Sequence, residues 1–425
     1  MKIKQLHTLF LKTGVVSTDT RNIQNGALFF ALKGENFDGN QFAKQALDSG
    51  ASIAVIDDPA CFIDDTKIIL VEDTLAALQR LAAYHRKQLN TPIVALTGSN
   101  GKTTSKELIN SVLSKQYETV ATKGNLNNHI GVPLTLLNLK TSTEIAIVEM
   151  GANHHGEITQ LCEIAQPDYG YITNFGKAHL EGFGSLEGVV KAKTELYRHL
   201  AKNDKIIFVN IDDPKQVAEA KEGNIFSFGS SNDANVQVKF VKAAPFVEIV
   251  FENIKVCSKL IGAYNFNNIA AAIAIGKYFN VPDSKIRQGI ENYQPENNRS
   301  QILKKGTNTL LMDAYNANPT SMLAAIENMV QLPKQQKILI LGDMFEVGEQ
   351  TAQEHQEIVN AIEKQDFQKV FLIGNHFKNT TSEMKYMYKF KNFAEFQENF
   401  EMPNNSFILV KGSRGMQLER ILDLF

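Results

Sequence analysis

The sequence lacks the features that mark membrane, secreted or nucleic-acid-binding proteins. It contains no run of 18 apolar residues, so we expect no membrane-spanning helix. Residues 1–16 carry charges and a histidine where a signal peptide would need an apolar stretch. The formal net charge is −2, so no basic excess indicates binding to nucleic acid or to an anionic membrane surface. We therefore expect a cytoplasmic protein without a nucleic-acid partner, and we treat it as a monomer.

Cysteine is also scarce. The three residues of this type, Cys61, Cys162 and Cys257, lie far apart in the chain. An odd number without a C-x-x-C pair argues against a disulfide framework, a zinc site or a redox pair. We expect free thiols in a reducing compartment.

The length of 425 residues exceeds what one hydrophobic core usually holds, and it predicts about three domains. Near the start, apolar runs at 27–32 and 53–56 predict buried strands, and residues 42–47 predict a helix. The polar segment 86–92 then predicts a linker. We place the three domains at residues 1–85, 86–296 and 297–425.

The middle of the chain alternates between predicted strands and helices. Short continuous apolar runs, typical of parallel strands buried on both faces, occur at residues 93–96, 145–148 and 206–209, and residues 169–173 predict a further strand. Residues 224–260 are richer in strand signals, and residues 265–278 predict a strongly apolar helix. We expect an α/β domain with a mainly parallel sheet.

After Pro295 the alternation restarts. Four apolar runs predict strands at residues 310–312, 338–341, 370–373 and 407–410. Polar residues or glycine follow each run, and in open α/β sheets ligands bind beyond the carboxyl ends of the strands. Between the runs, Asn318 and Pro319 have the residue types of a helix cap and of a first helical position. We expect an α/β domain whose strand ends face a site.

The most informative segment is 97–104, with the sequence Thr-Gly-Ser-Asn-Gly-Lys-Thr-Thr. It joins the run 93–96 to an apolar helical pattern, which is the layout of a phosphate-binding loop. Its glycines let backbone N–H groups approach a phosphate, Lys102 adds charge on the terminal phosphates, and the Thr103 hydroxyl can ligate Mg²⁺. The segment predicts a nucleotide site, with ATP and Mg²⁺ as its ligands.

This loop is shorter than the general pattern G-x-x-x-x-G-K-[ST]. The first glycine of that pattern would fall at Leu96, so the loop has the form G-x-x-G-K-T instead. The shortened form narrows the choice of protein family as well as the choice of ligand.

Two side chains that follow predicted strands have more than one interpretation. Glu149 closes the run 145–148, where phosphate-loop proteins often hold the nucleotide's Mg²⁺, and it could equally be an exposed acid at a strand end. His179 follows the run 169–173 and could bind a second metal, although an isolated histidine is more often structural. The phosphate loop favours the metal at Glu149, and position alone leaves His179 open.

Two further segments are ambiguous. Lys193 lies among Lys and Glu neighbours, which is typical of a solvated helix face. Asn265 and Asn268 open the apolar helix, where asparagine is usually a cap but can also contact the edge of adenine. The residues themselves favour a solvated helix face for Lys193, and they leave the role of the two asparagines open.

Taken together, these segments resemble the Mur ligase family of ATP-dependent amide-forming enzymes. The resemblance covers nearly the whole chain, and the shortened phosphate loop is the family's own form. The other matching blocks are residues 17–21, 31–39, 123–133, 149–154, 178–185, 192–195, 298–300, 313–319 and 411–416. Any one block is weak, and their common order carries the resemblance.

The resemblance implies three α/β domains: a small N-terminal substrate domain, a central P-loop ATPase-like domain with a mainly parallel sheet, and a C-terminal Rossmann-like domain. It implies that ATP converts the terminal carboxylate of UDP-N-acetylmuramoyl-tripeptide into an acyl phosphate. The amine of D-alanyl-D-alanine would then form the amide, which gives the UDP-muramoyl-pentapeptide precursor of peptidoglycan.

The resemblance also implies roles for individual residues. Thr103 and Glu149 would hold one Mg²⁺, and His179 would join a second site. Lys193 occupies the position of a carbamylated lysine, whose anionic form can lie close to Mg²⁺. The predicted catalytic residues are Lys102, His179 and Lys193. The predicted ATP contacts are Gly98, Ser99, Asn100, Gly101, Lys102, Thr103, Thr104, Asn268, Arg299 and Asp313.

The resemblance assigns nine contacts to the two other substrates. They are Thr20, Arg21, Asn36 and Phe37 for the uridine-diphosphate end, Asn127 and Asn128 for the muramoyl-peptide, and Lys411, Ser413 and Arg414 for the incoming dipeptide.

Three rival interpretations fit less of the sequence. A sister ligase that adds a diamino acid carries an Asp-Asn-Pro-Arg block, whereas this chain has Asp-Ala-Tyr-Asn-Ala-Asn-Pro at 313–319. Folylpolyglutamate synthetase shares the ATPase core but would leave residues 1–85 without a purpose. A nucleotide-binding switch would not need a second metal, so Glu149, His179 and Lys193 together argue against it.

Overall fold

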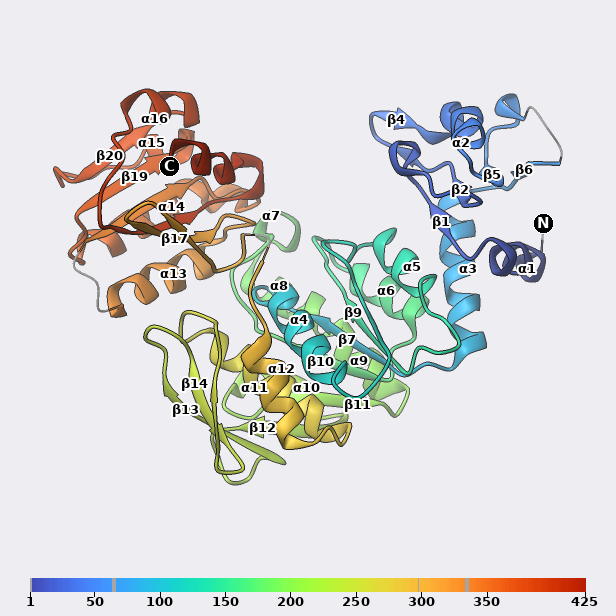
Figure 1. Ribbon diagram of the computed structural model, residues 1–425, viewed down its shortest axis with the longest axis horizontal. Helices are drawn as coiled ribbons and strands as arrows, with labels where there is room; N and C mark the ends of the chain where they lie inside the picture. The colour runs from blue at the N-terminus through green and yellow to red at the C-terminus, as the bar shows by residue number, and fades with distance from the viewer. Residues whose placement is uncertain (1, 63–65, 297, 333–335) are drawn as a thin grey trace.

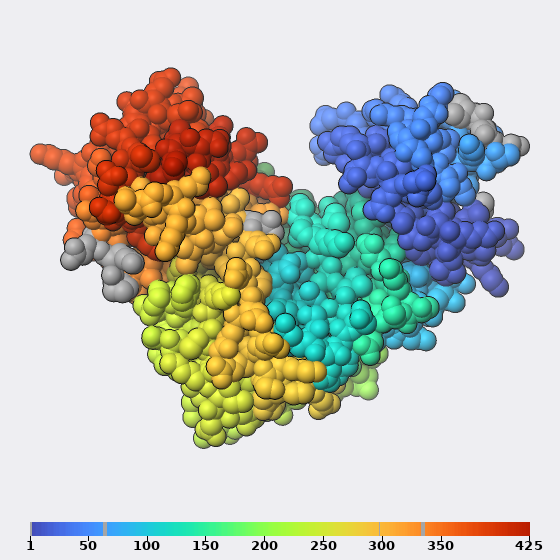
Figure 2. Space-filling model, in the orientation of Figure 1, coloured from blue at the N-terminus to red at the C-terminus, as the bar shows by residue number. Residues whose placement is uncertain are grey.

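The computed structural model has three lobes in chain order, and each is built around its own β-sheet (Figure 1). It describes residues 2–62, 66–296, 298–332 and 336–425. The N- and C-terminal lobes rise from the central lobe with an open gap between them (Figure 2). The expected three-domain α/β fold is confirmed, while the proposed boundary at 296/297 falls on residue 297, outside the described residues.

The N-terminal lobe holds a parallel four-stranded sheet in the order β1-β2-β5-β6. Its strands are β1 (Val16–Ser17), β2 (Leu28–Phe30), β5 (Ile53–Ile56) and β6 (Ile68–Leu70), with a small hairpin of β3 (Lys33–Gly34) and β4 (Phe37–Asp38). Alternate strand residues point to opposite faces. Leu28 and Phe30 therefore pack with helices α1 (Ile3–Thr13) and α3 (Thr74–Leu89), whereas Phe29 packs with α2 (Ala43–Asp48).

Helix α3 joins the first two lobes, and it overturns one prediction. We expected segment 86–92 to be a linker, but α3 continues to Leu89. Arg86 is buried there because its guanidinium donates to the carbonyl oxygen of Ala165 and pairs with Asp168 at 2.7 Å. The helix packs against α1 of the first lobe and against two helices of the central lobe (Figure 1).

The central lobe holds a nine-stranded sheet in the order β15-β14-β13-β12-β11-β10-β7-β9-β8. The sheet is parallel from β8 to β13 and ends in an antiparallel arm of β13, β14 and β15, which confirms the strand-rich segment 224–260. The strands are β7 (Ile93–Thr97), β8 (Thr119–Ala121), β9 (Ile145–Glu149), β10 (Tyr169–Ile172), β11 (Ile206–Asn210), β12 (Asn224–Gly229), β13 (Val236–Lys242), β14 (Glu248–Phe251) and β15 (Ile254–Cys257).

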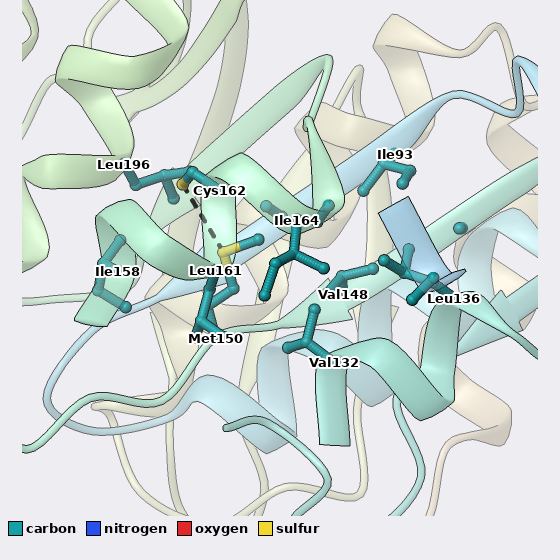
Figure 3. Packing of buried hydrophobic residues seen from close by; sticks show 14 of the residues in the cluster. Ile93, Val132, Leu136, Val148, Met150, Ile158, Leu161, Cys162, Ile164 and Leu196 are labelled. Carbon is teal, nitrogen blue, oxygen red and sulfur yellow. Dashed lines mark hydrogen bonds between the residues drawn. The ribbon is translucent and has the colours of Figure 1, made fainter. Parts of the chain in front are cut away.

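Helices cover both faces of this sheet, as its continuous apolar strands require. On one face Ile93 and Val148 pack with Val132 of α5 (Gly131–Leu136) and with Leu161 of α6 (Glu157–Ala165), as Figure 3 shows. The opposite face packs against α4 (Lys102–Leu113), α11 (Asn265–Tyr278) and α12 (Asp283–Asn292). The other helices of the lobe are α7 (Leu180–Phe183), α8 (Leu186–Lys193), α9 (Glu195–Lys202) and α10 (Pro214–Ala220).

The C-terminal lobe holds a six-stranded sheet in the order β16-β17-β21-β18-β19-β20. All neighbouring strands are parallel except β16 and β17. The strands are β16 (Gln301–Lys305), β17 (Asn308–Asp313), β18 (Lys337–Gly342), β19 (Lys369–Ile373), β20 (Met387–Phe390) and β21 (Phe407–Lys411). The helices are α13 (Pro319–Gln331), α14 (Thr351–Glu363), α15 (Asn375–Lys378) and α16 (Phe393–Asn399). This is the expected Rossmann-like arrangement.

The cysteines are free thiols, as expected. Cys162 lies in the core beside Met150, with 3.9 Å between the two sulfur atoms (Figure 3), and burial raises the pKa of its thiol. Across the ranges that the structure describes, the helices are too short or too polar for a membrane crossing.

Two buried histidines connect α1 to α3. Nε2 of His7 lies 3.0 Å from Nδ1 of His85, and Nε2 of His85 lies 3.0 Å from the carbonyl oxygen of Leu139. A carbonyl only accepts, so His85 donates from Nε2 and accepts from His7 at Nδ1. Burial lowers the pKa of both rings, and the mutual repulsion of the two charges lowers that of His7 further. The folded protein therefore favours the neutral form of both histidines.

We expect the free energy of unfolding to fall as the pH drops below about 6.5, because the unfolded chain then binds protons that the folded rings exclude. The limiting slope is about 1.4 kcal/mol per pH unit for each histidine. Urea unfolding at a series of pH values above and below about 6.5 measures this slope. The double variant His7→Leu/His85→Leu should flatten the dependence, and His129→Gln, which alters an exposed ring, should preserve it. An undiminished slope in the double variant would contradict the assignment.

Candidate active site

A cavity of about 700 Å³ lies where the central and C-terminal lobes meet. Its walls include the phosphate loop, the loops after β9 and β10, the start of α11, and the ends of β17 and β21. Most of the predicted site residues line it: Ser99, Asn100, Gly101, Lys102, Thr103, Thr104, Asn127, Asn128, Glu149, His179, Asn268, Arg299, Asp313, Lys411, Ser413 and Arg414. Gly98, Lys193 and the four residues of the N-terminal lobe are outside the lining.

Two of the four C-terminal strand ends face this cavity. Asp313 and Lys411, at the ends of β17 and β21, line it as expected. Asp343, which follows β18, is instead buried and accepts hydrogen bonds of 2.9 Å from the N–H groups of His376 and Phe377. Asp343 thus supports the start of α15 and does not face the cavity, whereas Phe345 and Glu346 further along the same loop line it.

The phosphate loop runs from β7 directly into α4, as the sequence predicts. Gly98 and Gly101 have φ of +142° and +78°, and a Cβ on either would collide with Thr173 or Asn268. Leu96, where the longer pattern has its first glycine, is an interior residue of β7 and fully buried. No described side chain caps the amino end of α4, so its first N–H groups are free for an anion.

The loop after β10 supports the phosphate loop. The Ser99 hydroxyl donates to the carbonyl oxygen of Gly176 and accepts from its N–H, both at 2.9 Å. The N–H of Asn100 donates to Oδ1 of Asn174 at 3.1 Å. These contacts fix the conformation of the phosphate loop.

Lys102 is folded back onto its own loop. Its Nζ donates to the carbonyl oxygens of Gly98 at 2.7 Å and of Ser99 at 3.3 Å. Burial lowers its pKa, and the Glu149 carboxylate opposes that shift. Phosphate oxygens are stronger acceptors than carbonyl oxygens for a cationic donor, so the ammonium group is positioned to turn toward a nucleotide.

Glu149 is a buried acid with one free oxygen. It is 1% exposed, which removes the alternative of an exposed strand-end acid. Its Oε1 accepts a hydrogen bond of 2.7 Å from Nδ2 of Asn127, whereas its Oε2 is buried without a partner. An unpaired carboxylate oxygen in such a position favours a cation as its ligand.

His179 contacts the other lobe. It has a left-handed backbone conformation, with φ of +52°, at the start of α7. Its Nδ1 lies 2.6 Å from Oε2 of Glu346, which belongs to the loop after β18. No signal in the sequence singled out Glu346, because its partner is 167 residues away along the chain; both residues line the cavity.

Lys193 is fully buried, and the interpretation as a solvated helix face is wrong. Its Nζ donates to the carbonyl oxygen of Ala152 at 3.0 Å and lies 5.1 Å from the centre of the Phe183 ring. Burial lowers its pKa well below the ordinary value, and the charge of Lys102 adds to that shift. The surroundings thus favour the uncharged form of the Lys193 amine, which lies in the core outside the lining of the cavity.

Two arginines of the C-terminal lobe share one aromatic ring. The guanidinium carbon of Arg299 lies 3.5 Å from the centre of the Tyr315 ring, and that of Arg414 lies 5.0 Å from it. Nη1 of Arg414 also donates to the Tyr315 hydroxyl at 3.0 Å. Tyr315, which the sequence did not single out, thus fixes two cationic groups at the cavity wall.

Other predicted residues in this wall bond to one another. Oδ2 of Asp313 accepts from Nζ of Lys411 at 2.6 Å, and its Oδ1 accepts from the N–H of Ser300 at 3.2 Å. The Ser413 hydroxyl accepts from the N–H of Phe345 at 2.8 Å. These bonds fix the side chains of the wall. The ammonium group of Lys411 contributes a positive charge that Asp313 already neutralises.

Asn268 connects two helices at the edge of the phosphate loop. Its Oδ1 accepts from the Ser105 hydroxyl at 2.9 Å, and its Nδ2 donates to Oδ1 of Asn265 at 2.8 Å. Asn265 donates in turn to the carbonyl oxygen of Ile261 at 2.8 Å. The amide of Asn268 keeps one N–H and one lone pair for a ligand.

Asn318 has a second role that the sequence did not reveal. It caps α13 as predicted, because its Oδ1 accepts from the N–H of Ser321 at 2.9 Å. Its Nδ2 also donates to Oδ1 of Asn100 at 2.7 Å, which ties the C-terminal lobe to the phosphate loop. The block at 313–319 was a signal for this site, although it did not indicate this bond.

The predicted substrate residues occupy two regions. Asn128 lines the cavity and accepts at Oδ1 from the N–H groups that begin α5. Arg21 and Phe37 are exposed on the N-terminal lobe, where Arg21 pairs with Asp19 at 2.7 Å. Thr20 and Asn36 lie on the same two segments as these residues. The structure thus places these four predicted residues on the N-terminal lobe, outside the lining of the cavity.

Protein side chains alone do not assemble a metal cage here. Within the residues that the structure describes, no group of three or more His, Cys, Asp or Glu side chains is placed to hold a metal ion. The predicted set of Thr103, Glu149, His179 and Lys193 differs from such a cage, since nucleotide phosphates would complete its coordination.

Comparison with known families covers most of the chain. The model for the Mur ligase family, catalytic domain, matches residues 13–86, and that for the Mur ligase middle domain matches residues 96–276. The model for the Mur ligase, glutamate ligase domain, matches residues 298–414.

Individual relatives agree over nearly their full length. A UDP-N-acetylmuramoyl-tripeptide–D-alanyl-D-alanine ligase of Bacillus subtilis (strain 168) is 36% identical, with 96% of this chain and 92% of the relative covered. The crystal structure of MurF from Acinetobacter baumannii is 32% identical, with a TM-score of 0.87 over 96% of this chain and 92% of that one. MurF ligase from Thermotoga maritima in complex with ADP is 26% identical, with a TM-score of 0.85 over 98% and 97% of the two chains. The chain belongs to the Mur ligase family.

Proposed function

We propose that this chain is an ATP-dependent ligase that joins UDP-N-acetylmuramoyl-tripeptide to D-alanyl-D-alanine and so forms the UDP-muramoyl-pentapeptide precursor of peptidoglycan. The observation that carries the proposal is the cavity in which the phosphate loop faces Arg299, Lys411 and Arg414 of the C-terminal lobe. The printed names of the relatives support the choice of substrates.

ATP suits the phosphate-loop side of this cavity. The N–H groups at the start of α4 and Nζ of Lys102 would bind its phosphates, and Ser99 and Thr104 belong to the same wall. Asn268 would contact the adenine, and Arg299 and Asp313 would contact the nucleotide from the C-terminal lobe. The bond between Asn318 and Asn100 holds that lobe against the loop.

Mg²⁺ suits the end of β9. The free Oε2 of Glu149 supplies one anionic ligand, and Thr103 in the same cavity would supply its hydroxyl. His179 would join a second ion. When bound, Mg²⁺ supplies positive charge that offsets the negative charge of the phosphates.

A carbamate at Lys193 would add a further anion. Burial lowers the pKa of this amine and so favours its uncharged form, whose lone pair can form an N–C bond with CO₂ as the nitrogen releases one proton. The resulting anion would lie within the electrostatic reach of Lys102, whose charge already affects Lys193. The carbamate would thereby become a candidate ligand for Mg²⁺.

The reaction has two steps, and the protein aligns the reactants and offsets their charge. In the first, the tripeptide carboxylate attacks the γ-phosphorus while Lys102 offsets the charge, and ADP leaves. In the second, the dipeptide amine attacks the acyl carbon, the C–O bond to phosphate breaks, and the proton that the nitrogen loses leaves with the phosphate or the solvent. Lys411, Ser413 and Arg414 would hold the dipeptide, and the docked C-terminal lobe would keep water from the acyl phosphate.

The uridine-diphosphate end would bind the N-terminal lobe at Thr20, Arg21, Asn36 and Phe37. The exposed ring of Phe37 offers a face on which uracil can stack. Asn127 and Asn128 would lie beside the muramoyl-peptide between this lobe and the nucleotide. On this proposal, the domains at 1–85, 86–296 and 297–425 hold the three substrates in order, and the protein acts as a cytoplasmic monomer.

The test is an amide-forming assay with the full chain. Phosphate release with Mg-ATP and UDP-muramoyl-tripeptide should require D-alanyl-D-alanine, and mass spectrometry should detect the pentapeptide product. Tripeptides that end in lysine or in diaminopimelate should both be tried. Release that ignores the dipeptide, or a product formed with a diamino acid and the dipeptide precursor, would contradict the proposal.

A further inference from the structure

Two residues with left-handed backbone face each other across the junction of the central and C-terminal lobes. His179 has φ of +52° and Glu346 has φ of +61°. Residues other than glycine seldom adopt this conformation, and the surrounding structure must hold them in it. Nδ1 of His179 lies 2.6 Å from Oε2 of Glu346, and both residues line the cavity.

The loop that carries Glu346 is attached to both lobes. The N–H of Phe345 donates to the Ser413 hydroxyl at 2.8 Å within the C-terminal lobe. The carbonyl oxygen of Glu346 accepts from the N–H of Glu181 at 3.4 Å, on the central lobe. The position of Glu346 beside His179 therefore depends on how the C-terminal lobe is docked.

We propose that Glu346 is a positioning residue that fixes the imidazole of His179 only when the C-terminal lobe is docked. Nδ1 of His179 is buried and makes no hydrogen bond to the described residues, although Oε2 of Glu346 lies 2.6 Å from it. A turn of the imidazole that aligns its N–H with this carboxylate sets the tautomer and leaves Nε2 as the nitrogen that can reach a ligand. The inference rests on the proposed function, in which His179 joins a Mg²⁺ site. Since the two residues come from different lobes, the affinity for Mg²⁺ becomes dependent on lobe docking.

The contact between Glu346 and His179 can be tested by measuring nucleotide affinity. Isothermal titration calorimetry of ADP with the full chain, in Mg²⁺ and then in EDTA, gives a readout that needs no turnover. Glu346→Ala should weaken ADP binding in Mg²⁺ by about tenfold or more, the usual effect of losing such a supporting carboxylate. In EDTA the affinity should stay within about twofold of wild type. Glu346→Gln, which keeps an acceptor, should restore part of the loss.

The matched control is Glu349→Ala, which removes an exposed carboxylate three residues further along the same loop. It should bind ADP like wild type under both conditions. Thermal unfolding of each variant shows whether the fold is retained. The proposal would be overturned if Glu346→Ala and Glu349→Ala changed the affinity for ADP in Mg²⁺ to the same extent.

The double variant with His179→Ala decides whether Glu346 acts through the ring. If it does, Glu346→Ala should change the affinity by less than about twofold once His179 is gone. The proposal is overturned if the losses of ADP affinity in the two single variants simply add in the double variant. It is also overturned if ADP binding to His179→Ala depends on Mg²⁺ as it does in wild type, since the ring would then need no positioning. Failure of the ligase function itself would appear separately, as the absence of amide product from the wild-type protein.

Discussion

Lys102→Ala is expected to lower the rate of phosphate release by about 10²–10³-fold or more, the range seen when one donor to a developing charge is removed. The ammonium group lies on the phosphate loop, and within the described part of the chain its bonds are to loop carbonyl oxygens, so its removal breaks no ion pair there. Affinity for the UDP substrate should change little, because its uridine end is assigned to the N-terminal lobe. Steady-state kinetics and titration with the UDP substrate measure the two effects separately.

Two further variants separate charge from packing. Lys102→Met keeps most of the volume without the charge, and it should be as inactive as Lys102→Ala. Lys140→Ala alters an exposed lysine of the same lobe and should be fully active. Near-normal turnover in Lys102→Met would show that the phosphate loop does not act on the transferred phosphate.

Lys193→Ala is expected to lose activity by about 10–100-fold or more, and short carboxylates should restore part of it. The physical reason is that the substitution removes the neutral amine that would carry the carbamate and leaves a small cavity in the core. Acetate or formate can occupy that cavity and supply the missing anion near Lys102. Activity with and without each carboxylate measures the rescue, and ¹³C NMR of the wild-type protein in ¹³CO₂ should show a carbamate signal.

Lys191→Ala is the control for this variant. It removes an exposed lysine from the same helix, and it should be active without any additive. Thermal unfolding of Lys193→Ala shows whether a loss of activity reflects a loss of folded protein. Full activity of folded Lys193→Ala without carboxylate would contradict the carbamate.

The order of strands and helices could be predicted because each depends on a local pattern. The run 145–148 and the phosphate loop need only neighbouring residues to be identified, and both are found where expected. The end of α3 could not be predicted in this way. The charge of Arg86 suggests solvent, and the carbonyl and carboxylate that bury it come from residues about eighty positions later in the sequence.

The site shows the same division between local and distant contacts. Motif residues such as Lys102 and Glu149 were identifiable, and they line one cavity. The hydrogen bonds that orient the motif residues could not be predicted. The bonds of Glu149 to Asn127 and of Asn100 to Asn318 join segments that only the folded chain brings together. Lys193 shows why: its helix carries charges on several sides, and only packing decides which one is buried.

Helix α3 also limits which parts of the molecule can move. Its 16 residues form a rod roughly 24 Å long, and Leu78 and Leu81 belong to the same hydrophobic cluster as Phe30 and Val148. The first two lobes thus share one continuous core and should unfold together. On the proposed function, this shared core would keep the spacing between the uridine end and the reacting carboxylate constant. We therefore expect a substrate whose peptide is one residue shorter to leave its carboxylate out of reach of the nucleotide.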